Sequence, residues 1–198
     1  HVDSLIIDDC LFEDNGYAAI YYTNPASGVI TCSYAKITNT TIYNVGDPNH
    51  ETGIIDIREG VSGANENEII IDHVTIYDFK NPAGYGAIMP YKSGNVVVSN
   101  SIVMNPETTS SYAFRVYNGV KIQNTLYYNC KPKTDGGAIY TNCLNVDPLF
   151  VDAANGNFAL MPLSPARGAA TDGGDLGDPR WYTSVTKYTV TATANPAE

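Results

Sequence analysis

The chain of 198 residues, 43% of them hydrophobic, is long enough to bury the core of one domain. Its formal net charge of −10, in a sequence with only 16% charged residues, argues against a nucleic-acid partner. Because no stretch approaches the length of a transmembrane span, we do not expect an integral membrane protein.

A short unit recurs along the chain. Each copy has an alternating apolar strand, a polar residue, four mostly apolar or small residues and a second polar residue. The copies occupy residues 5–14, 35–44, 69–78, 96–105 and 120–129, with a degraded copy at 145–152. Their polar pairs are Asp9/Asp14, Asn39/Asn44, His73/Asp78, Asn100/Asn105, Asn124/Asn129 and Asp147/Asp152. The first polar residues recur after 30, 34, 27, 24 and 23 positions, and a period of this size is typical of a solenoid.

A second series of apolar strands lies between the copies. Strand-like alternation without helical periodicity predicts an all-β parallel β-helix of about six rungs. Asn and Asp recur at the bends because they tolerate the left-handed conformation. Equivalent apolar residues are expected to stack inward, with rungs about 4.8 Å apart. The second strands are expected at residues 17–22, 53–58, 86–91, 112–117 and 137–141, and the inward column at Ile7, Ile37, Ile71, Val98 and Ile122.

The β-helix is expected over residues 1–160, and residues 161–198 are expected to form the C-terminal cap and tail of the same domain. The Gly-rich stretch 164–177 predicts an irregular cap over the open end of the core, with Trp181 packed beneath it. Because the chain opens directly on a strand, without a capping element, we also expect an N-terminal remainder of a longer parent protein.

The histidine and cysteine residues carry no clear chemical signature. His73 lies in a column of Asn and Asp residues, so a hydrogen-bonded bend is the favoured interpretation over a catalytic role. The four cysteines lack metal-site spacing. Cys130 and Cys143 either form a bridge across one rung or remain buried free thiols. Acidic loops of the second rung would suit calcium, but solvated loops are the favoured interpretation.

Basic and aromatic residues recur in the second-strand series. Because side chains of successive rungs align in rows, we expect these residues to form a strip on one lateral face. Such a strip can hold a uronate through bidentate arginine contacts and can stack a sugar ring on tyrosine. A solvated face with long side-chain stems is the alternative. The predicted strip consists of Arg58, Tyr91, Lys92, Arg115 and Tyr117.

The rung pattern over residues 1–160 resembles the right-handed β-helix of the pectate-lyase-like superfamily. The stretch Tyr91-Lys-Ser-Gly-Asn-Val-Val-Val-Ser-Asn-Ser-Ile-Val, followed by Ala113-Phe-Arg-Val-Tyr-Asn-Gly, is similar to the chondroitinase B and alginate lyase group. The closing stretch, residues 157–177, resembles the end of uncharacterised β-helix domains in Bacteroidetes surface proteins. The resemblance implies an extracellular, periplasmic or outer-membrane location.

The same resemblance implies a catalytic pair. Lys92 would be the base and Arg115 the acid or charge partner of a β-elimination next to a uronate carboxylate, which calcium neutralises in that family. The family's His and Gly after the Arg are here Val116 and Tyr117. Its paired calcium-binding Glu residues are not matched at residues 85–88. Calcium is therefore suggested as a cofactor only by the resemblance.

Three function classes remain open at this point. One is an extracellular carbohydrate-active domain that binds and cleaves an acidic polysaccharide. Another is a non-catalytic glycan-binding module of a larger surface protein, and the third is a structural spacer. The unmatched calcium ligands favour the second class over the first. The Tyr- and Arg-rich strands argue against the third.

Overall fold

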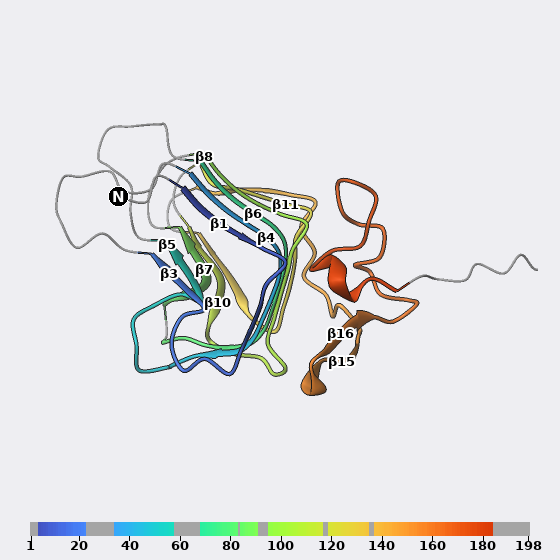
Figure 1. Ribbon diagram of the computed structural model, residues 1–198, viewed down its shortest axis with the longest axis horizontal. Coiled ribbons are helices and arrows are strands. Elements are labelled where there is room, and N and C mark those ends of the chain that lie inside the picture. The colour runs from blue at the N-terminus through green and yellow to red at the C-terminus, as the bar shows by residue number, and fades with distance from the viewer. Residues whose placement is uncertain are drawn as a thin grey trace, which may run out of the picture.

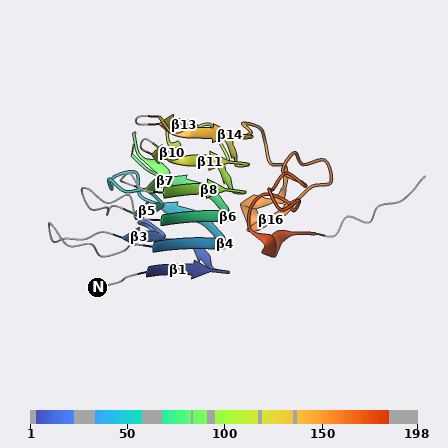
Figure 2. The same cartoon turned by 90° about the horizontal axis from the view of Figure 1, so that it is seen from above.

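The computed structural model describes residues 4–22, 34–57, 68–82, 84–90, 95–116, 119–134 and 137–183. Its strands stack as a parallel β-helix, in which each turn of the chain lies on the one before it (Figures 1 and 2). The described residues form five rungs and the beginning of a sixth. Within these ranges, no helix has the length and apolar character needed to cross a bilayer.

Two parallel sheets form the wall of the β-helix. Four strands of the predicted second-strand series form the smaller sheet, which we call the second sheet, together with a strand at residues 131–134 that the sequence did not predict. The first sheet contains β1 (Ser4–Asp8), β2 (Leu11–Glu13), β4 (Tyr34–Gly46), β6 (Glu68–Lys80), β8 (Asn95–Ser99), β9 (Ile102–Met104), β11 (Lys121–Gln123), β12 (Leu126–Tyr128) and β14 (Ile139–Thr141). The second sheet contains β3 (Ile20–Tyr22), β5 (Ile55–Ile57), β7 (Gly86–Pro90), β10 (Tyr112–Val116) and β13 (Lys131–Thr134).

The predicted inward column is confirmed by the strand register. Ile7 pairs with Ile37, Ile37 with Ile71, Ile71 with Val98, and Val98 with Ile122. The last four are fully buried. Ile7 is only partly buried because it lies in the first rung, where only the second rung stacks on it. The alternation of apolar residues therefore builds a continuous core along the axis.

The predicted bends are also confirmed. Nine of the ten polar residues in the first five pairs have the positive φ of the left-handed region, from 45° at Asn124 to 53° at Asp14, Asn44 and Asn129. Asn and Asp adopt this conformation more readily than other residues with a Cβ, which explains their recurrence. Asn105 is the exception. Its side-chain oxygen instead accepts a hydrogen bond of 2.9 Å from the Phe79 backbone N–H.

The last rung differs from the prediction. Asn142, with φ of 51°, takes the bend position in place of Asp147, and β14 just before it pairs with β11 of the first sheet. The stretch 137–141 is therefore not a member of the second sheet. Tyr140 occupies the inward column next to Ile122, where it closes the stack with an aromatic ring.

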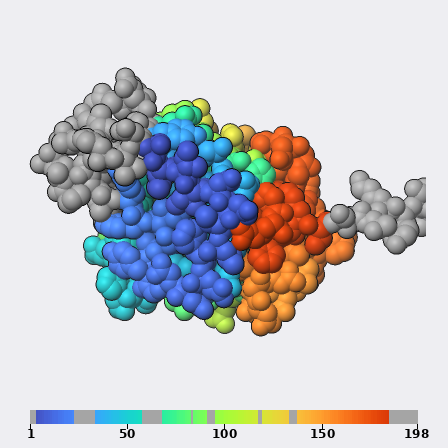
Figure 3. Space-filling model, viewed as in Figure 1, coloured from blue at the N-terminus to red at the C-terminus, as the bar shows by residue number. Residues whose placement is uncertain are grey.

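The C-terminal segment, residues 145–183, is irregular as expected but lies in a different place. It packs against a lateral face of the β-helix and not over the open end (Figures 1 to 3). It contains an antiparallel hairpin, β15 (Phe150–Asp152) and β16 (Asn157–Leu160), and two short 3-10 turns, η1 (Ala153–Asn155) and η2 (Pro179–Trp181).

Hydrogen bonds along several rungs hold the C-terminal segment in place. Its Arg180 pairs with Asp9 of the first rung at 2.7 Å, and its Ala169 carbonyl accepts from Asn124 of the fifth rung at 3.0 Å. Contacts that run from the first rung to the fifth are incompatible with a cap on one end. Trp181 donates to Thr41 of the second rung at 2.7 Å, so it too lies on the lateral face.

Candidate functional site

The predicted basic and aromatic strip is only partly described. Arg115 lies on β10 of the second sheet and is half-buried. The other four residues, Arg58, Tyr91, Lys92 and Tyr117, lie outside the described residues. The proximity of Lys92 and Arg115, on which a lyase mechanism depends, stays a prediction.

Arg115 belongs to a row of residues on the outer side of the second sheet. Tyr21 pairs with Asp56, and Asp56 pairs with Met89. Because β10 continues the register of β7, Arg115 takes the next place in the row. The neighbouring residues in each strand belong to the hydrophobic core, so the row faces outward. Of these four side chains, Tyr21 is 40% exposed and Arg115 is partly buried, whereas Asp56 and Met89 are fully buried.

The guanidinium of Arg115 is held by an aromatic ring. Its Cζ lies 4.7 Å from the centre of the Tyr85 ring, which is a cation–π distance. The Tyr85 hydroxyl in turn donates to Glu51 at 3.0 Å. Burial and the neighbouring Glu51 raise the pKa of Tyr85, so this hydroxyl stays protonated at neutral pH. The arginine is thus positioned by two residues from two preceding loops.

Close backbone approach explains the glycine at the start of β7. A Cβ on Gly86 would lie 2.5 Å from the backbone nitrogen of Arg115, far inside normal contact. Glycine at this position lets β7 and β10 approach each other closely, which places Arg115 beside Tyr85.

An aromatic group lies at the first-rung end of the same sheet. Tyr17 makes edge-to-face contacts with Tyr21 at 5.8 Å and with His50 at 5.2 Å between ring centres. Asp47 fixes the histidine through an Nδ1 contact of 2.6 Å. Tyr17 and Tyr21 are both more than a third exposed, so their rings are available to a ligand.

Asp56, the only acid in the predicted second strands, is not available for chemistry with a bulky substrate. It is fully buried, and its Oδ2 accepts a hydrogen bond of 2.9 Å from the Gly53 backbone N–H. We therefore assign Asp56 a structural role in the turn that precedes β5.

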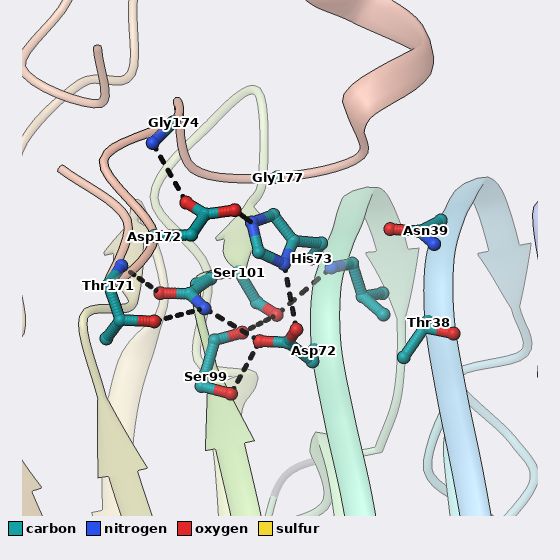
Figure 4. Close-up of polar contacts among 12 residues, drawn as sticks. Thr38, Asn39, Asp72, His73, Ser99, Ser101, Thr171, Asp172, Gly174 and Gly177 are labelled. Carbon is teal, nitrogen blue, oxygen red and sulfur yellow. Dashed lines mark hydrogen bonds and ion pairs between the residues drawn. The ribbon is translucent and has the colours of Figure 1, made fainter. Parts of the chain in front are cut away.

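His73 is a bend residue, as predicted, but its partners are carboxylates. Its φ is 52°, and only 7% of the residue is exposed. Nδ1 lies 2.8 Å from Asp72 Oδ2, and Nε2 lies 3.7 Å from Asp172 of the C-terminal segment (Figure 4). The hydrogen bond with Asp72 raises the pKa of His73 despite its burial. The cluster joins the C-terminal segment to the third rung.

The structure also contains a groove that the sequence did not predict. A cavity of about 460 Å³ lies between the outer side of rungs one to three and the turn of the C-terminal hairpin. We call it the hairpin groove. It is lined by Glu13, Asp14, Tyr43, Asn44, Tyr77, Asp78, Pro106, Ala153, Ala154, Asn155 and Gly156.

The cysteines and acidic residues of the described ranges form neither a disulfide nor a metal site. Cys10, Cys130 and Cys143 are free thiols there, so the bridge between the last two is not formed. Burial raises the pKa of Cys130 to about 12, which makes its thiol inert. Cys32 lies outside the described residues. No group of three or more His, Cys, Asp or Glu residues converges as a metal site within the same ranges.

Comparison with protein families gives a match over more than half of the chain. A family model described as a domain of unknown function, DUF5123, matches residues 69–181. The match begins with β6 of the third rung and runs through Trp181, so it includes both β-helix rungs and most of the C-terminal segment. A search among curated proteins finds no match.

Proposed function

We propose that this chain, which belongs to the DUF5123 family, is a carbohydrate-binding β-helix domain of the pectate-lyase-like superfamily. Its ligand is an acidic polysaccharide that lies along the outer side of the second sheet. The observation that carries the proposal is the fixed guanidinium of Arg115 over Tyr85, in a row that ends in the exposed ring of Tyr21.

The chemistry of this row suits a uronate chain. A guanidinium can bind a carboxylate through two parallel hydrogen bonds, and tyrosine rings offer flat faces to the apolar side of a sugar. Tyr21 and Arg115 present such groups from the two ends of the row, three rungs apart, and the fully buried Asp56 and Met89 lie between them. The solenoid thus supports binding to an extended chain more readily than to a compact ligand.

The overall charge of the protein does not oppose this proposal at contact distance. A net charge of −10 repels a polyanion from afar. At physiological ionic strength, screening removes most of that repulsion beyond about 8 Å, so local contacts decide binding. Such a ligand is consistent with an extracellular, periplasmic or outer-membrane location of the domain.

A lyase of acidic polysaccharide is the second candidate, and the resemblance around Lys92 and Arg115 favours it. In this mechanism Lys92 removes the proton next to the uronate carboxylate while Arg115 stabilises the developing negative charge. The bond to the glycosidic oxygen on the adjacent carbon then breaks, a carbon–carbon double bond forms, and the leaving oxygen takes a proton from the Lys92 ammonium. Lys92 must first lose its own proton, which a neighbouring cation such as Arg115 promotes by lowering the lysine pKa. Without this chemistry, the same face binds the chain and does not cut it.

The experiment is a binding screen with an activity readout. Polygalacturonate, alginate and chondroitin are tested beside carboxyl-reduced polygalacturonate, which keeps the sugar ring but lacks the charge. We expect at least one polyuronate to bind and the reduced polymer to bind about tenfold more weakly. Ultraviolet absorbance of an unsaturated product, lost in Lys92→Ala, would establish cleavage. Binding of none of the polyuronates would refute the proposal.

A further inference from the structure

The turn at residues 47–52, between β4 and β5, connects the aromatic group of the first rung with the guanidinium of the fourth. Its His50 packs edge to face on Tyr17, with 5.2 Å between ring centres. Its Glu51 accepts the hydrogen bond of the Tyr85 hydroxyl, and the Tyr85 ring in turn holds the guanidinium. Four successive rungs thus contribute to one band of side chains at the corner that leads into the second sheet. We call it the corner band, and it consists of Tyr17, Tyr21, His50, Glu51, Tyr85 and Arg115.

Hydrogen bonds at both ends of this turn hold it in place. At its start, Asp47 accepts a bond of 2.8 Å from the Asn49 backbone N–H and contacts His50 Nδ1 at 2.6 Å. The Asn49 N–H, and after it the His50 ring, lower the pKa of Asp47, so the carboxylate stays ionised. At its end, the buried side chain of Asn81 donates a bond of 2.8 Å to the Thr52 carbonyl. The His50 ring is therefore fixed in place without a ligand.

The corner band offers two kinds of contact to a sugar chain. Tyr17 and Tyr21 are more than a third exposed, and the His50 side chain is 55% exposed, so flat rings are accessible at the first two rungs. The fixed guanidinium of Arg115 at the fourth rung suits a carboxylate. Three rung spacings, about 14 Å, separate the two ends of the band. A ligand that reaches both ends is therefore longer than one sugar unit.

The charges along the corner band change sign. Arg115 carries a positive charge at the fourth rung, and the exposed Glu51 carries a negative charge two rungs away, at about 10 Å. The bond from Tyr85 goes to the Glu51 carboxylate and leaves its charge unneutralised. A sugar chain with a carboxylate on every unit meets this like charge as soon as one unit binds the arginine. An uncharged sugar at the second rung avoids the repulsion.

From these features we infer that the corner band binds an oligosaccharide in which uncharged sugars separate the uronates. One uronate lies at Arg115, an uncharged sugar packs on the rings of Tyr17 and Tyr21, and Glu51 disfavours a carboxylate between them. The inference rests on the proposed function, in which an acidic polysaccharide lies along the second sheet, the polyuronate face. It adds the length and the charge pattern of that ligand.

Calorimetric and NMR titrations of the full chain test the charge pattern. The probes are hexagalacturonate with every carboxyl group free, the same hexamer with half or all of its carboxyl groups methyl-esterified, and the unsulfated chondroitin hexasaccharide, whose uronates alternate with uncharged sugars. We call the half-esterified hexamer and the chondroitin hexasaccharide the interrupted ligands. We expect at least one of them to bind about threefold more tightly than the free-acid hexamer. Full esterification should weaken binding about tenfold, because no carboxylate remains for Arg115.

Glu51→Gln assigns the charge pattern to the corner band. Glutamine removes the charge but keeps an oxygen that accepts the bond from Tyr85. Binding of the free-acid hexamer should become about threefold tighter, and binding of the interrupted ligands should change less. Glu68→Gln is the matched control, because it removes the same charge from an exposed position on β6 of the first sheet. It should leave the affinity for the free-acid hexamer unchanged.

Tyr17→Ala tests the length of the ligand. The variant should bind the tighter interrupted ligand about fivefold more weakly than wild type, because a sugar loses its aromatic contact. A disaccharide of the same ligand, bound at Arg115, does not reach the first rung, so its affinity should stay the same. Tyr17→Phe keeps the ring and should bind both lengths like wild type.

Four results would overturn the inference. They are tightest binding of the free-acid hexamer, equal effects of Glu51→Gln and Glu68→Gln, an effect of Tyr17→Ala that is the same for both lengths, and binding of none of these hexasaccharides. The proposed function is judged by its own polymer screen and by Arg115→Ala, so the two can fail separately.

Discussion

Asn100 donates a hydrogen bond of 2.8 Å from its side-chain amide to Asp72 of the preceding rung, and Asn39 makes the same 2.8 Å contact with Asp8. In both cases the hydroxyl residue just before the Asn donates a second bond of 2.6 Å to the same carboxylate oxygen. The two contacts repeat one arrangement at two levels of the β-helix. Each carboxylate therefore joins two successive rungs at the bend.

The first prediction separates this contact from the docking of the C-terminal segment. Asn100 also bonds Thr171 through both its amide nitrogen and its oxygen, whereas Asn39 has no such contact in the described residues. Asn100→Ala should lower the free energy of unfolding by about 1–3 kcal/mol. Asn39→Ala is the matched control and should cost less. Urea denaturation measures both, and an equal loss would show that the Thr171 contacts contribute nothing.

The second prediction concerns pH. The pKa of His73 is raised, so its stabilising contribution is fully present below the unfolded pKa of about 6.5 and is lost as pH rises through the folded value. Burial works to raise the pKa of Asp72, but the hydrogen bonds from His73 and Ser99 outweigh it and lower it. Its contribution is therefore lost at the acidic end, as pH falls through the folded value.

His73→Asn tests this assignment. Asparagine tolerates the left-handed bend but cannot carry a charge. The stability of the variant should therefore no longer fall as pH rises above about 6.5. Denaturation midpoints of both proteins between about pH 4 and 9 provide the measurement, because this range spans the His73 titration. If the two profiles run parallel across this range, His73 is not the group responsible.

The third prediction identifies the residue that anchors the C-terminal segment. Phe158 is 1% exposed, and its ring contacts Tyr43 and Tyr77 of the β-helix as well as Trp181 of its own segment. Phe158→Ala should cost about 3–5 kcal/mol and increase hydrogen exchange throughout residues 145–183. Leu163→Ala, at a site 89% exposed in the same segment, should change neither. If hydrogen exchange in residues 145–183 is as slow in Phe158→Ala as in the wild type, the assignment is refuted.

The fourth prediction tests the inward column. Ile71 is fully buried, and Ile70 beside it faces outward and is only partly buried. Ile71→Ala should lower the free energy of unfolding by about 2–5 kcal/mol, because it leaves a cavity in the middle of the stack. Ile70→Ala should cost less than half as much. Similar losses in chemical denaturation would contradict the register.

The regular part of the fold could be predicted from the sequence because one period governs it. Alternation identified the inward column, and Asn or Asp at fixed spacing identified the bends. The last rung was misassigned because Asp147 and Asp152 repeat the polar spacing, while the true bend at Asn142 follows a short strand. Sequence spacing alone does not distinguish the two.

The place of the C-terminal segment could not be predicted. It has no periodicity, and its contacts depend on residues far apart in sequence. Asp178, for example, accepts a hydrogen bond of 2.7 Å from Thr41, which lies 137 positions earlier. The hairpin groove was missed for the same reason. Tyr43 and Tyr77 are ordinary outward strand positions until the hairpin covers them.

The position of Arg115 in the row of the second sheet could be predicted from the sequence, but its side-chain contacts could not. Arg115 was found because side chains of the second strands align along the axis. Tyr85, which holds the guanidinium, and Glu51, which accepts a hydrogen bond from Tyr85, come from irregular loops whose conformation no pattern specifies. The interaction that fixes the arginine was therefore visible only in the structure.

The most direct test of the polyuronate face is a titration of wild type and Arg115→Ala with the tightest-binding polyuronate oligosaccharide. Lys121→Ala is the matched control, because Lys121 is an exposed cation on β11 of the other sheet. Loss of a charged contact to a carboxylate should weaken binding by about tenfold or more in Arg115→Ala, and Arg115→Lys should lie between it and wild type. Lys121→Ala should bind like wild type. Equal affinities of wild type and Arg115→Ala would contradict the account.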